Sequence, residues 1–163
     1  MTRDQAAVLF SSRSDDWATP EWFFARVSRI YRLGLDVCAT AANAKCPKFY
    51  TPAEDGLTRD WTADAAGAGV WMNPPYGREI SKWVAKAAAE ARKGTPVVAL
   101  LPARTDTRWW HEWVAPFALV RFVRGRLTFG GARHIAPFPS ALAVFDTLEV
   151  ENSACIPSRT LAG

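Results

Sequence analysis

The chain has 163 residues, of which 49% are hydrophobic and 22% charged, as in a folded globular protein and unlike a disordered one. That length predicts a single domain, 1–163, with loose tails at about 1–15 and 151–163. The net charge of +4 is compatible with a polyanionic partner, and no apolar run approaches the roughly 20 residues of a membrane span. The apolar stretch at the N-terminus is too short for a secretory signal, so we expect a cytoplasmic protein.

The first 60 residues predict one helix, one buried strand and a long loop. Thr19 as N-cap, Pro20 at the first helical position and an acid at Glu21 are typical of a helix start. The buried side of this helix is expected to hold Trp22, Phe23, Val27, Ile30 and Tyr31. The apolar run 33–38 predicts a buried strand that carries Asp36, and 39–60 predicts mostly loop, with a short strand at 48–50.

The remaining pattern alternates strands and helices. A strand at 70–72, preceded by turn glycines Gly67 and Gly69, runs into the segment Asn73-Pro74-Pro75-Tyr76. A helix is predicted over 79–93, with Glu90 on its outer face beside two lysines. A strand at 96–101, a tryptophan-rich helix at 107–115 and strands at 119–123, 126–129 and 140–145 follow. This order predicts an α/β protein whose mostly parallel central sheet, flanked by helices, brings Asp36 and Asn73 to its carboxyl edge.

The cysteines and histidines predict no metal site. Cys38, Cys46 and Cys155 form no CxxC pair, and His111 and His134 complete no zinc-ligand spacing. An odd number of cysteines also argues against a disulfide framework, so we expect reduced thiols.

The segment Asn73-Pro74-Pro75-Tyr76 contains the residues that we expect to catalyse a reaction. An aromatic amine such as that of adenine is a poor nucleophile because its lone pair is delocalised into the ring. The side-chain oxygen of Asn73 and the carbonyl of Pro74 can accept its two hydrogens and free the lone pair, while the prolines keep both oxygens aimed. Tyr76 offers a face for a flat base, which must be flipped out of a duplex. The plainer interpretation is a proline turn with Tyr76 merely packing.

Here the chain resembles the small phage and prophage Dam-type DNA N-6-adenine methyltransferases, from about Ser11 to Phe145. The resemblance is carried by matching pieces in matching order: Asp16-Trp17-Ala18-Thr19-Pro20, Leu35-Asp36-Val37-Cys38-Ala39, Asn43-Ala44-Lys45-Cys46, Asp55-Gly56-Leu57, Asp60-Trp61, Asn73–Gly77 and Leu101-Pro102-Ala103-Arg104-Thr105-Asp106. It implies a Rossmann-like class I S-adenosylmethionine-dependent fold without a separate target-recognition domain. It also implies an adenine-specific DNA methyltransferase encoded by a phage or prophage.

The resemblance also implies roles for single residues. Asn73, Pro74, Pro75 and Tyr76 would be catalytic. The S-adenosylmethionine site would comprise Thr19, Pro20, Asp36, Cys38, Ala39, Asp60, Trp61 and Asn73. Plainer roles exist for two of these residues, because Thr19 can be an N-cap and Asp60 can cap a turn.

One feature departs from the pattern of full-sized methyltransferases. Ala39-Thr40-Ala41-Ala42 stands where those enzymes have a glycine-rich turn, and the acid for the cofactor ribose is not obvious, with Glu54 and Asp55 as candidates.

Arginines follow the predicted strand at 96–101. We expect Arg104, Arg108 and Arg126 to contact DNA phosphates, although a solvated face is the alternative for any single arginine. The partner is expected to be double-stranded DNA, and the tryptophans Trp109, Trp110 and Trp113 belong either to the core or to a homodimer surface. Other activities compatible with the motif are methylation of an RNA base amine, of a cytosine amine or of a protein glutamine. A silent DNA- or cofactor-binding module is the alternative without catalysis.

Overall fold

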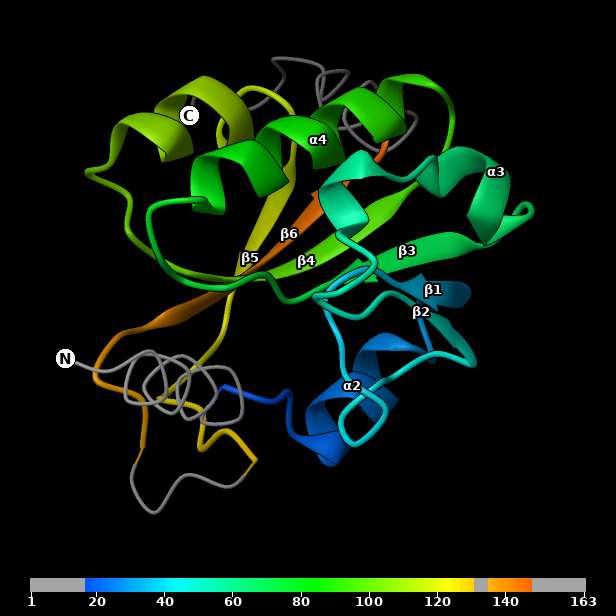
Figure 1. Ribbon diagram of the computed structural model, residues 1–163. Coiled ribbons are helices and arrows are strands. Elements are labelled where there is room, and N and C mark those ends of the chain that lie inside the picture. Colours follow the sequence, from blue (N-terminus) through cyan, green and yellow to red (C-terminus); the bar gives the residue numbers. More distant parts are fainter. Residues whose placement is uncertain (1–16, 131–134, 148–163) are drawn as a thin grey trace, which may run out of the picture.

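The computed structural model describes residues 17–130 and 135–147. A six-stranded sheet in the order β2–β1–β3–β4–β6–β5 runs through it (Figure 1). The expected tails at 1–15 and 151–163, together with Arg133, His134 and Cys155, lie outside the described residues. None of the helices in the described ranges has the length and apolar character that a membrane crossing requires.

The sheet is mixed rather than mostly parallel, which corrects the prediction. β1 (Leu33–Asp36) pairs in parallel with β2 (Lys48–Phe49) and β3 (Gly69–Met72), and β3 pairs in parallel with β4 (Val97–Pro102). β6 (Ser140–Phe145) is antiparallel to both of its neighbours, β4 and β5 (Leu119–Phe122). Every residue of β6 is buried, and a strand buried on both faces gives no sign of its direction in its composition.

Two local predictions about strands are wrong. Gly69 is not a turn glycine but the first residue of β3, where a side chain would press on the carbonyls of Arg32 and Pro96. Residues 126–129 form no strand. They precede an isolated bridge between Ala18 and Gly130, and the carbonyl of Leu127 accepts a backbone hydrogen bond from the N–H of Ala136.

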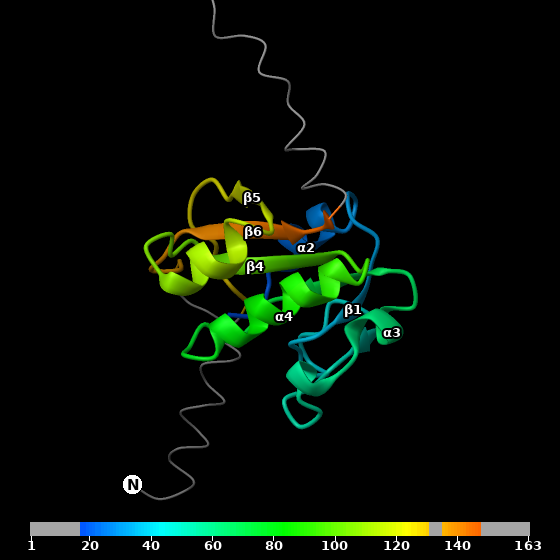
Figure 2. The same cartoon turned by 90° about the horizontal axis from the view of Figure 1, so that it is seen from above.

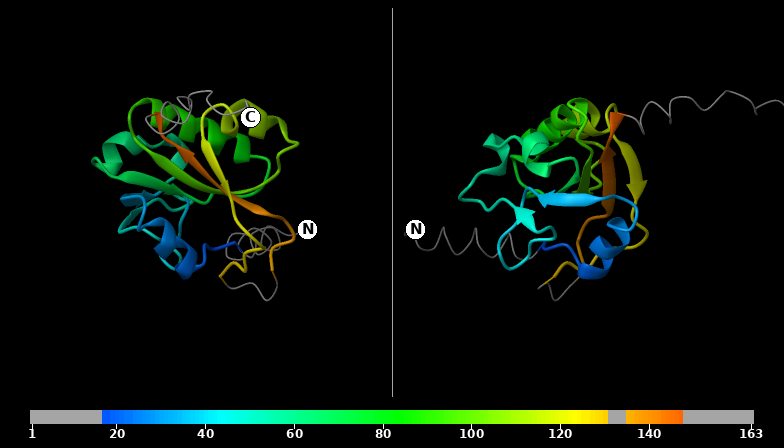
Figure 3. Two further views of the ribbon diagram at one scale, coloured as in Figure 1. Left: turned by 180° about the vertical axis from the view of Figure 1, so that it is seen from behind. Right: turned by 90° about the vertical axis from the view of Figure 1, so that its right-hand side faces the viewer.

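Helices cover the two faces of the sheet unequally. α3 (Trp61–Ala65), α4 (Ile80–Arg92) and the π-helical turn η2 (Trp110–Val114) cover one face, and α2 (Glu21–Val27) covers the other (Figures 1 and 2). The view from behind shows α2 on its own side of the sheet (Figure 3). A short 3₁₀ helix, η1 (Gly56–Thr58), precedes α3. The apolar core is accordingly divided into two clusters, one on each face. Trp109 and Trp110 are buried in the α4-side cluster, and Trp113 packs against it.

α2 begins one residue later than predicted. Pro20, not Thr19, is the N-cap, and its carbonyl accepts hydrogen bonds from the N–H groups of Phe23 and Phe24. Trp22 and Ile30 are 55% and 73% exposed, so their predicted place on the buried side is wrong. The hydroxyl of Thr19 is therefore free for a different contact, described below.

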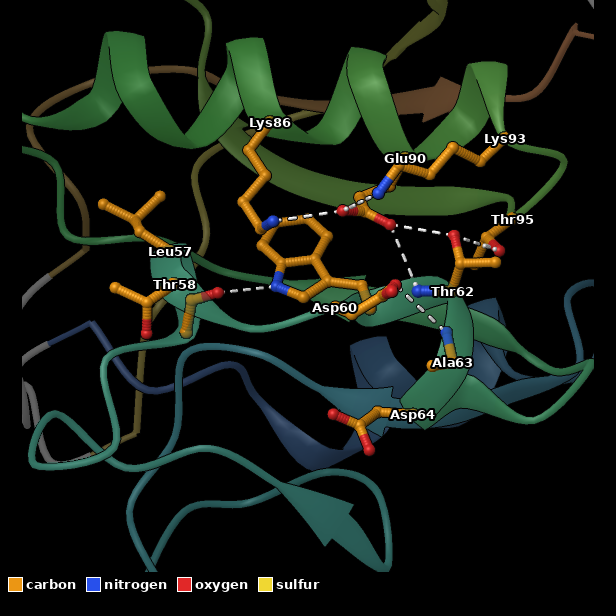
Figure 4. Close-up of polar contacts among 12 residues, drawn as sticks. Leu57, Thr58, Asp60, Thr62, Ala63, Asp64, Lys86, Glu90, Lys93 and Thr95 are labelled. Atoms are coloured by element: carbon orange, nitrogen blue, oxygen red, sulfur yellow. Dashed lines mark hydrogen bonds and ion pairs between the residues drawn. The ribbon is translucent and has the colours of Figure 1, made fainter.

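α4 forms as predicted except at Glu90, which is 1% exposed instead of lying on the outer face. One carboxylate oxygen of Glu90 accepts from the backbone N–H and the hydroxyl of Thr62, at 3.1 and 2.8 Å (Figure 4). The other accepts from Lys86 and Lys93 at 3.0 and 3.1 Å. Glu90 thus ties α4 to α3, a contact that helical periodicity alone does not reveal.

Replacing Glu90 with glutamine is expected to lower the free energy of unfolding by about 3 kcal/mol, because two ammonium groups lose their buried counter-charge. Glu79→Gln on the same helix is the matched control. Its pair with Lys82 is exposed, so a change of no more than about 0.5 kcal/mol is expected. Urea unfolding followed by circular dichroism measures both, and equal effects would contradict the role given to Glu90.

The contribution of Glu90 to the free energy of unfolding also depends on pH. Burial alone raises the pKa of this carboxyl, but hydrogen bonds from Thr62 and the two lysines outweigh burial and hold the pKa below its ordinary value of 4.5. A carboxyl whose folded pKa is depressed stabilises the fold above its unfolded pKa and loses that contribution as the pH falls. The stability difference between wild type and Glu90→Gln should therefore shrink below about pH 4.5.

Candidate active site

The carboxyl ends of β1 and β3 form the structural centre of the candidate site. These strands are neighbours, and Asp36 is opposite Trp71. The chain continues from β1 to β2 on one side of β1, whereas β3 lies on the other side of β1, so the strand order reverses here. Open α/β sheets bind ligands at the carboxyl edge where the strand order reverses in this way. Asp36 and Asn73 both lie at this edge, as predicted from their positions at strand ends.

Asn73 follows β3 and is held by the segment that precedes α2. Its side-chain nitrogen donates to the backbone carbonyl of Trp17 at 2.8 Å and to the hydroxyl of Thr19 at 3.1 Å. A backbone carbonyl can only accept, so these contacts fix which side of the amide carries the oxygen. That oxygen, Oδ1, is buried and has no hydrogen-bond partner among the described residues. Asn73 therefore presents an oriented, unused acceptor.

Tyr76 lies beyond two prolines of which Pro74 is buried and Pro75 exposed. The phenol donates a hydrogen bond to the backbone carbonyl of Leu100 on β4 at 3.2 Å, which fixes the ring over the sheet edge. Burial raises the pKa of Tyr76 far above its ordinary value, so the phenol stays protonated and remains a donor. The loop that carries the motif is thus fastened at both ends, by Asn73 and by Tyr76.

Three further rings surround Tyr76 and form with it what we term the aromatic cluster: Trp17, Tyr76, Phe129 and Phe138. Trp17 stacks on Tyr76 with ring centroids 6.2 Å apart and 30° between the planes. Phe129 and Phe138 meet Tyr76 edge-on at 6.3 and 5.5 Å. Sequence reasoning did not find this cluster, because its members come from three distant segments. Two signals were available: Trp17 belongs to the matching piece at 16–20, and the sequence allows Phe138-Pro139-Ser140 to form either a turn before the last strand or a loop edge beside the flipped base.

Asp36 ends β1 and organises the loop that follows. It is 2% exposed, and its two carboxylate oxygens accept the backbone N–H groups of Cys38 and Lys45 at 3.2 and 3.0 Å. Burial raises the pKa of Asp36 from 3.8 to about 6, and the two hydrogen bonds and the charge of Lys45 reduce that rise. The predicted ligand contact of Asp36 is therefore less direct than expected, since both of its oxygens already bind the chain.

The carboxyl of Asp36 is expected to titrate near pH 6, which carbon-detected NMR of the side-chain carboxyl would measure. Because the folded pKa lies above the unfolded value of 3.8, Asp36 contributes most to stability below about pH 3.8. That contribution is lost as the pH rises through about 6. Asp64, whose pKa is lowered chiefly by a hydrogen bond from Lys48, is the internal control, and a shared midpoint would contradict the assignment.

The turn after β1 contains no glycine and is held by hydrogen bonds between Thr40 and the residues that follow it. The N–H of Thr40 donates to Asn43 Oδ1 at 2.7 Å, and the carbonyl of Thr40 accepts from the N–H groups of Asn43 and Ala44. Ala39 is buried and Cys38 half-buried, and burial raises the pKa of the Cys38 thiol well above its ordinary value. The hydroxyl of Thr40 is buried without a partner among the described residues, so a second unused polar atom lies at this edge.

Comparison with known proteins identifies the family of this chain. The sequence profile of the family described as DNA N-6-adenine-methyltransferase (Dam) matches residues 7–144. The chain belongs to this family. It is 34% identical over 105 residues to the DNA N-6-adenine-methyltransferase of Haemophilus phage HP1, covering 63% of this chain and 58% of that protein.

Two further relatives resemble this member of the Dam family. It is 32% identical over 115 residues to the DNA N-6-adenine-methyltransferase of Escherichia phage T1, covering 70% of this chain and 47% of that protein. It is also 32% identical over 78 residues to the putative methyltransferase YfdM of Escherichia coli K12, covering 45% of this chain and 85% of that protein. The matched segments thus span about half the length of the two phage relatives. The resemblance read from the sequence is confirmed.

Asp60 and Trp61, expected at the cofactor of this Dam-family chain, occupy different environments. Asp60 is exposed and caps α3 by accepting the N–H of Ala63 at 3.2 Å, the plainer of its two roles (Figure 4). Trp61 is 0% exposed, and its indole N–H donates to the carbonyl of Gly56 at 2.7 Å. Lys86 lies over its ring at 5.0 Å. The structure thus places Trp61 in the core.

Glu54 and Asp55, the candidates for the ribose acid, both serve local structure. The carboxylate of Glu54 accepts from the N–H and hydroxyl of Thr51, and that of Asp55 accepts from the N–H of Leu57. Neither contact identifies a ribose site. Within the described residues, no three His, Cys, Asp or Glu side chains are grouped to hold a metal ion.

The three arginines expected to contact DNA are all exposed, but they differ in surroundings. Arg104 follows β4 at the carboxyl edge and is close enough to Tyr76 for its charge to oppose the rise in the phenol's pKa. Arg108 is paired with Glu112, and Arg126 donates to the carbonyl of Ala136 at 3.2 Å. Arg104 is therefore the arginine most closely associated with the candidate site.

Proposed function

We propose that this protein transfers a methyl group from S-adenosylmethionine to the exocyclic amine of adenine in DNA. The observation that carries the proposal is the buried, unpartnered Oδ1 of Asn73, aimed by the contacts of its nitrogen with Trp17 and Thr19. An unsatisfied buried acceptor costs stability, and such strained or unsatisfied groups concentrate at functional sites. Membership in the Dam family supports adenine as the base and DNA as its carrier.

Asn73 and Pro74 perform the chemistry expected of this chain. In the proposed complex, Asn73 Oδ1 and the Pro74 carbonyl each accept one hydrogen of the target amine, which draws the nitrogen toward a pyramidal geometry and frees its lone pair. The Asn73 amide is oriented before the base arrives, so it needs no reorganisation as positive charge develops on the nitrogen. An asparagine cannot take up the proton that is lost after transfer, and water at the site can accept it.

The carboxyl edge of β1 suits the cofactor. Cys38, Ala39 and Thr40 line the turn at the reversal of strand order, and the buried, unpartnered hydroxyl of Thr40 fits a polar ligand there. We assign these residues, with Asp60 at the rim, to binding, and Asp36 to holding their loop. S-adenosylmethionine would supply an activated methyl group bonded to a positively charged sulfur. This arrangement favours a Rossmann-like class I methyltransferase fold.

The target base would reach the site from a duplex by flipping. An amine engaged in a base pair is out of reach of Asn73, and extrusion of a base costs a few kcal/mol, roughly the amount that stacking on an aromatic ring can return. Tyr76 and its neighbours in the aromatic cluster supply such rings. Arg104, which follows β4 at this edge, would contact a phosphate beside the flipped nucleotide.

The decisive experiment incubates the full chain with labelled S-adenosylmethionine and unmethylated duplex DNA, then resolves the nucleosides by mass spectrometry. N-6-methyl-2′-deoxyadenosine in the digest is the expected product. N-4-methyl-2′-deoxycytidine would contradict the choice of base. Label that enters only RNA or protein would identify one of the other amines, and cofactor binding without any transfer would indicate a silent module.

A further inference from the structure

The first residue of β6 carries an unused hydroxyl at the same edge of the sheet. Ser140 is 1% exposed, and its Oγ has no hydrogen-bond partner among the described residues. Its backbone is firmly placed, because its carbonyl accepts the N–H of Val123 at 3.0 Å and it pairs with Pro102 at the carboxyl end of β4. The hydroxyl is therefore held in position without satisfying any group of the chain.

Ser140 and Asn73 share one face of the sheet. Side chains two residues apart on a strand lie on the same face. Ser140 is two residues before Leu142, and Asn73 two residues after Trp71, and both of those residues pack in the apolar cluster on the α2 side. β4 lies between β3 and β6, so the two residues are two strands apart, about 10 Å across the sheet. They are also offset by two positions along the strands, because Met72 is opposite Ala99 and Ser140 is opposite Pro102.

Members of the aromatic cluster adjoin both residues, since the carbonyl of Trp17 accepts from Asn73 and Phe138 is two residues before Ser140. Tyr76 is fastened to Leu100 on β4, the intervening strand. Phe138, two residues before Ser140, contacts the rings of both Tyr76 and Trp17, with centroids 5.5 and 4.8 Å apart. A flat heterocycle that took the place of Trp17 on Tyr76 would have an acceptor on one side, Asn73 Oδ1, and the hydroxyl of Ser140 on the other.

We infer that Ser140 binds the flipped base. Its hydroxyl donates a hydrogen bond to a ring nitrogen of adenine, while Asn73 accepts a hydrogen bond from the amine. This inference rests on the proposed function and adds a residue that determines how the base is seated. The hydroxyl is the only proton donor that the serine side chain offers, and the ring nitrogens of adenine are acceptors. Rings of the aromatic cluster must separate for the base to enter, because both polar atoms are buried.

Ser140→Ala tests the inference, with thermal unfolding and steady-state kinetics measured on the same preparation. Removing an unsatisfied buried hydroxyl should leave the melting temperature unchanged or raise it. At the same time kcat/KM for duplex DNA should fall about tenfold, the loss of about one good hydrogen bond. A lowered melting temperature would indicate a structural partner for the hydroxyl, and an unchanged kcat/KM would mean no contact with the base; either result overturns the inference.

Base analogues identify the contact itself. In duplexes with 1-deazaadenine or 3-deazaadenine at the methylated position, wild type should lose about tenfold in kcat/KM with the analogue that lacks the contacted nitrogen. Ser140→Ala should no longer distinguish that analogue from adenine. Equal discrimination by both proteins overturns the inference while N-6-methyl-2′-deoxyadenosine still forms from adenine-containing DNA. No N-6-methyl-2′-deoxyadenosine from wild type would instead defeat the proposed function.

Discussion

Asn73→Ala is expected to lower kcat at least about 100-fold while KM for DNA changes by only a few-fold, because the amide oxygen acts mainly as charge develops on the target nitrogen. The substitution removes the buried acceptor and also frees the Trp17 carbonyl and the Thr19 hydroxyl from their shared donor. Single-turnover transfer of labelled methyl groups to duplex DNA measures the effect directly.

The effect of the orientation of the Asn73 amide on kcat can be measured separately from the effect of removing the amide. Thr19→Val keeps the size of the side chain but removes one acceptor of the Asn73 nitrogen, so a smaller loss of kcat is expected. Thr19→Ser keeps the hydroxyl and should restore most of that loss. Circular dichroism of each variant shows whether the fold is intact. A folded Asn73→Ala protein with the kcat of wild type would refute the assigned chemistry.

Trp61→Ala is expected to reduce the free energy of unfolding by about 3 to 5 kcal/mol, since it leaves a large cavity beneath α3 and removes the donor to the Gly56 carbonyl. Trp22→Ala is the matched control. Trp22 is 55% exposed, and its loss should change stability by about 0.5 kcal/mol or less. Urea unfolding followed by far-ultraviolet circular dichroism compares them without relying on tryptophan fluorescence.

The Trp61 experiment also decides between two roles. The family resemblance predicts contact with the cofactor, whereas the structure surrounds the ring with Lys86 and Trp83. Calorimetric titration with S-adenosylmethionine gives the second readout. A Trp61→Ala protein of nearly unchanged stability with much weaker cofactor binding would restore the first role.

The strands and helices with long apolar patterns were predictable from the sequence. β4, β6 and α4 bury most of their residues and appear close to the predicted bounds. α3 has only five residues and depends on the Asp60 cap and on Glu90 from α4, so no local pattern indicated it. The direction of β6 was equally hidden, because it follows from pairing with β4 and β5 and not from composition.

The candidate site was predictable only in part. The position of Asn73 and Tyr76 at a strand end follows from the local sequence. The contacts that orient Asn73 come from residues 54 and 56 positions earlier in the chain. Phe129, Phe138 and Ser140 reach the site because the antiparallel β6 brings the segment before it to the carboxyl edge. Such long-range contacts depend on topology, which single-sequence patterns do not encode.

The position of β6 between β4 and β5 determines when the sheet can be completed during synthesis of the chain. β5 joins the sheet only through β6, and β6 is the last of the described strands to leave the ribosome. A nascent chain that ends before Ser140 can pair β1 to β4 but has neither a partner for β5 nor the segment that carries Phe138 beside Tyr76. Domains tend to fold as units during synthesis. The candidate site is therefore completed only once β6 has been synthesised, and a product truncated before Ser140 would lack it.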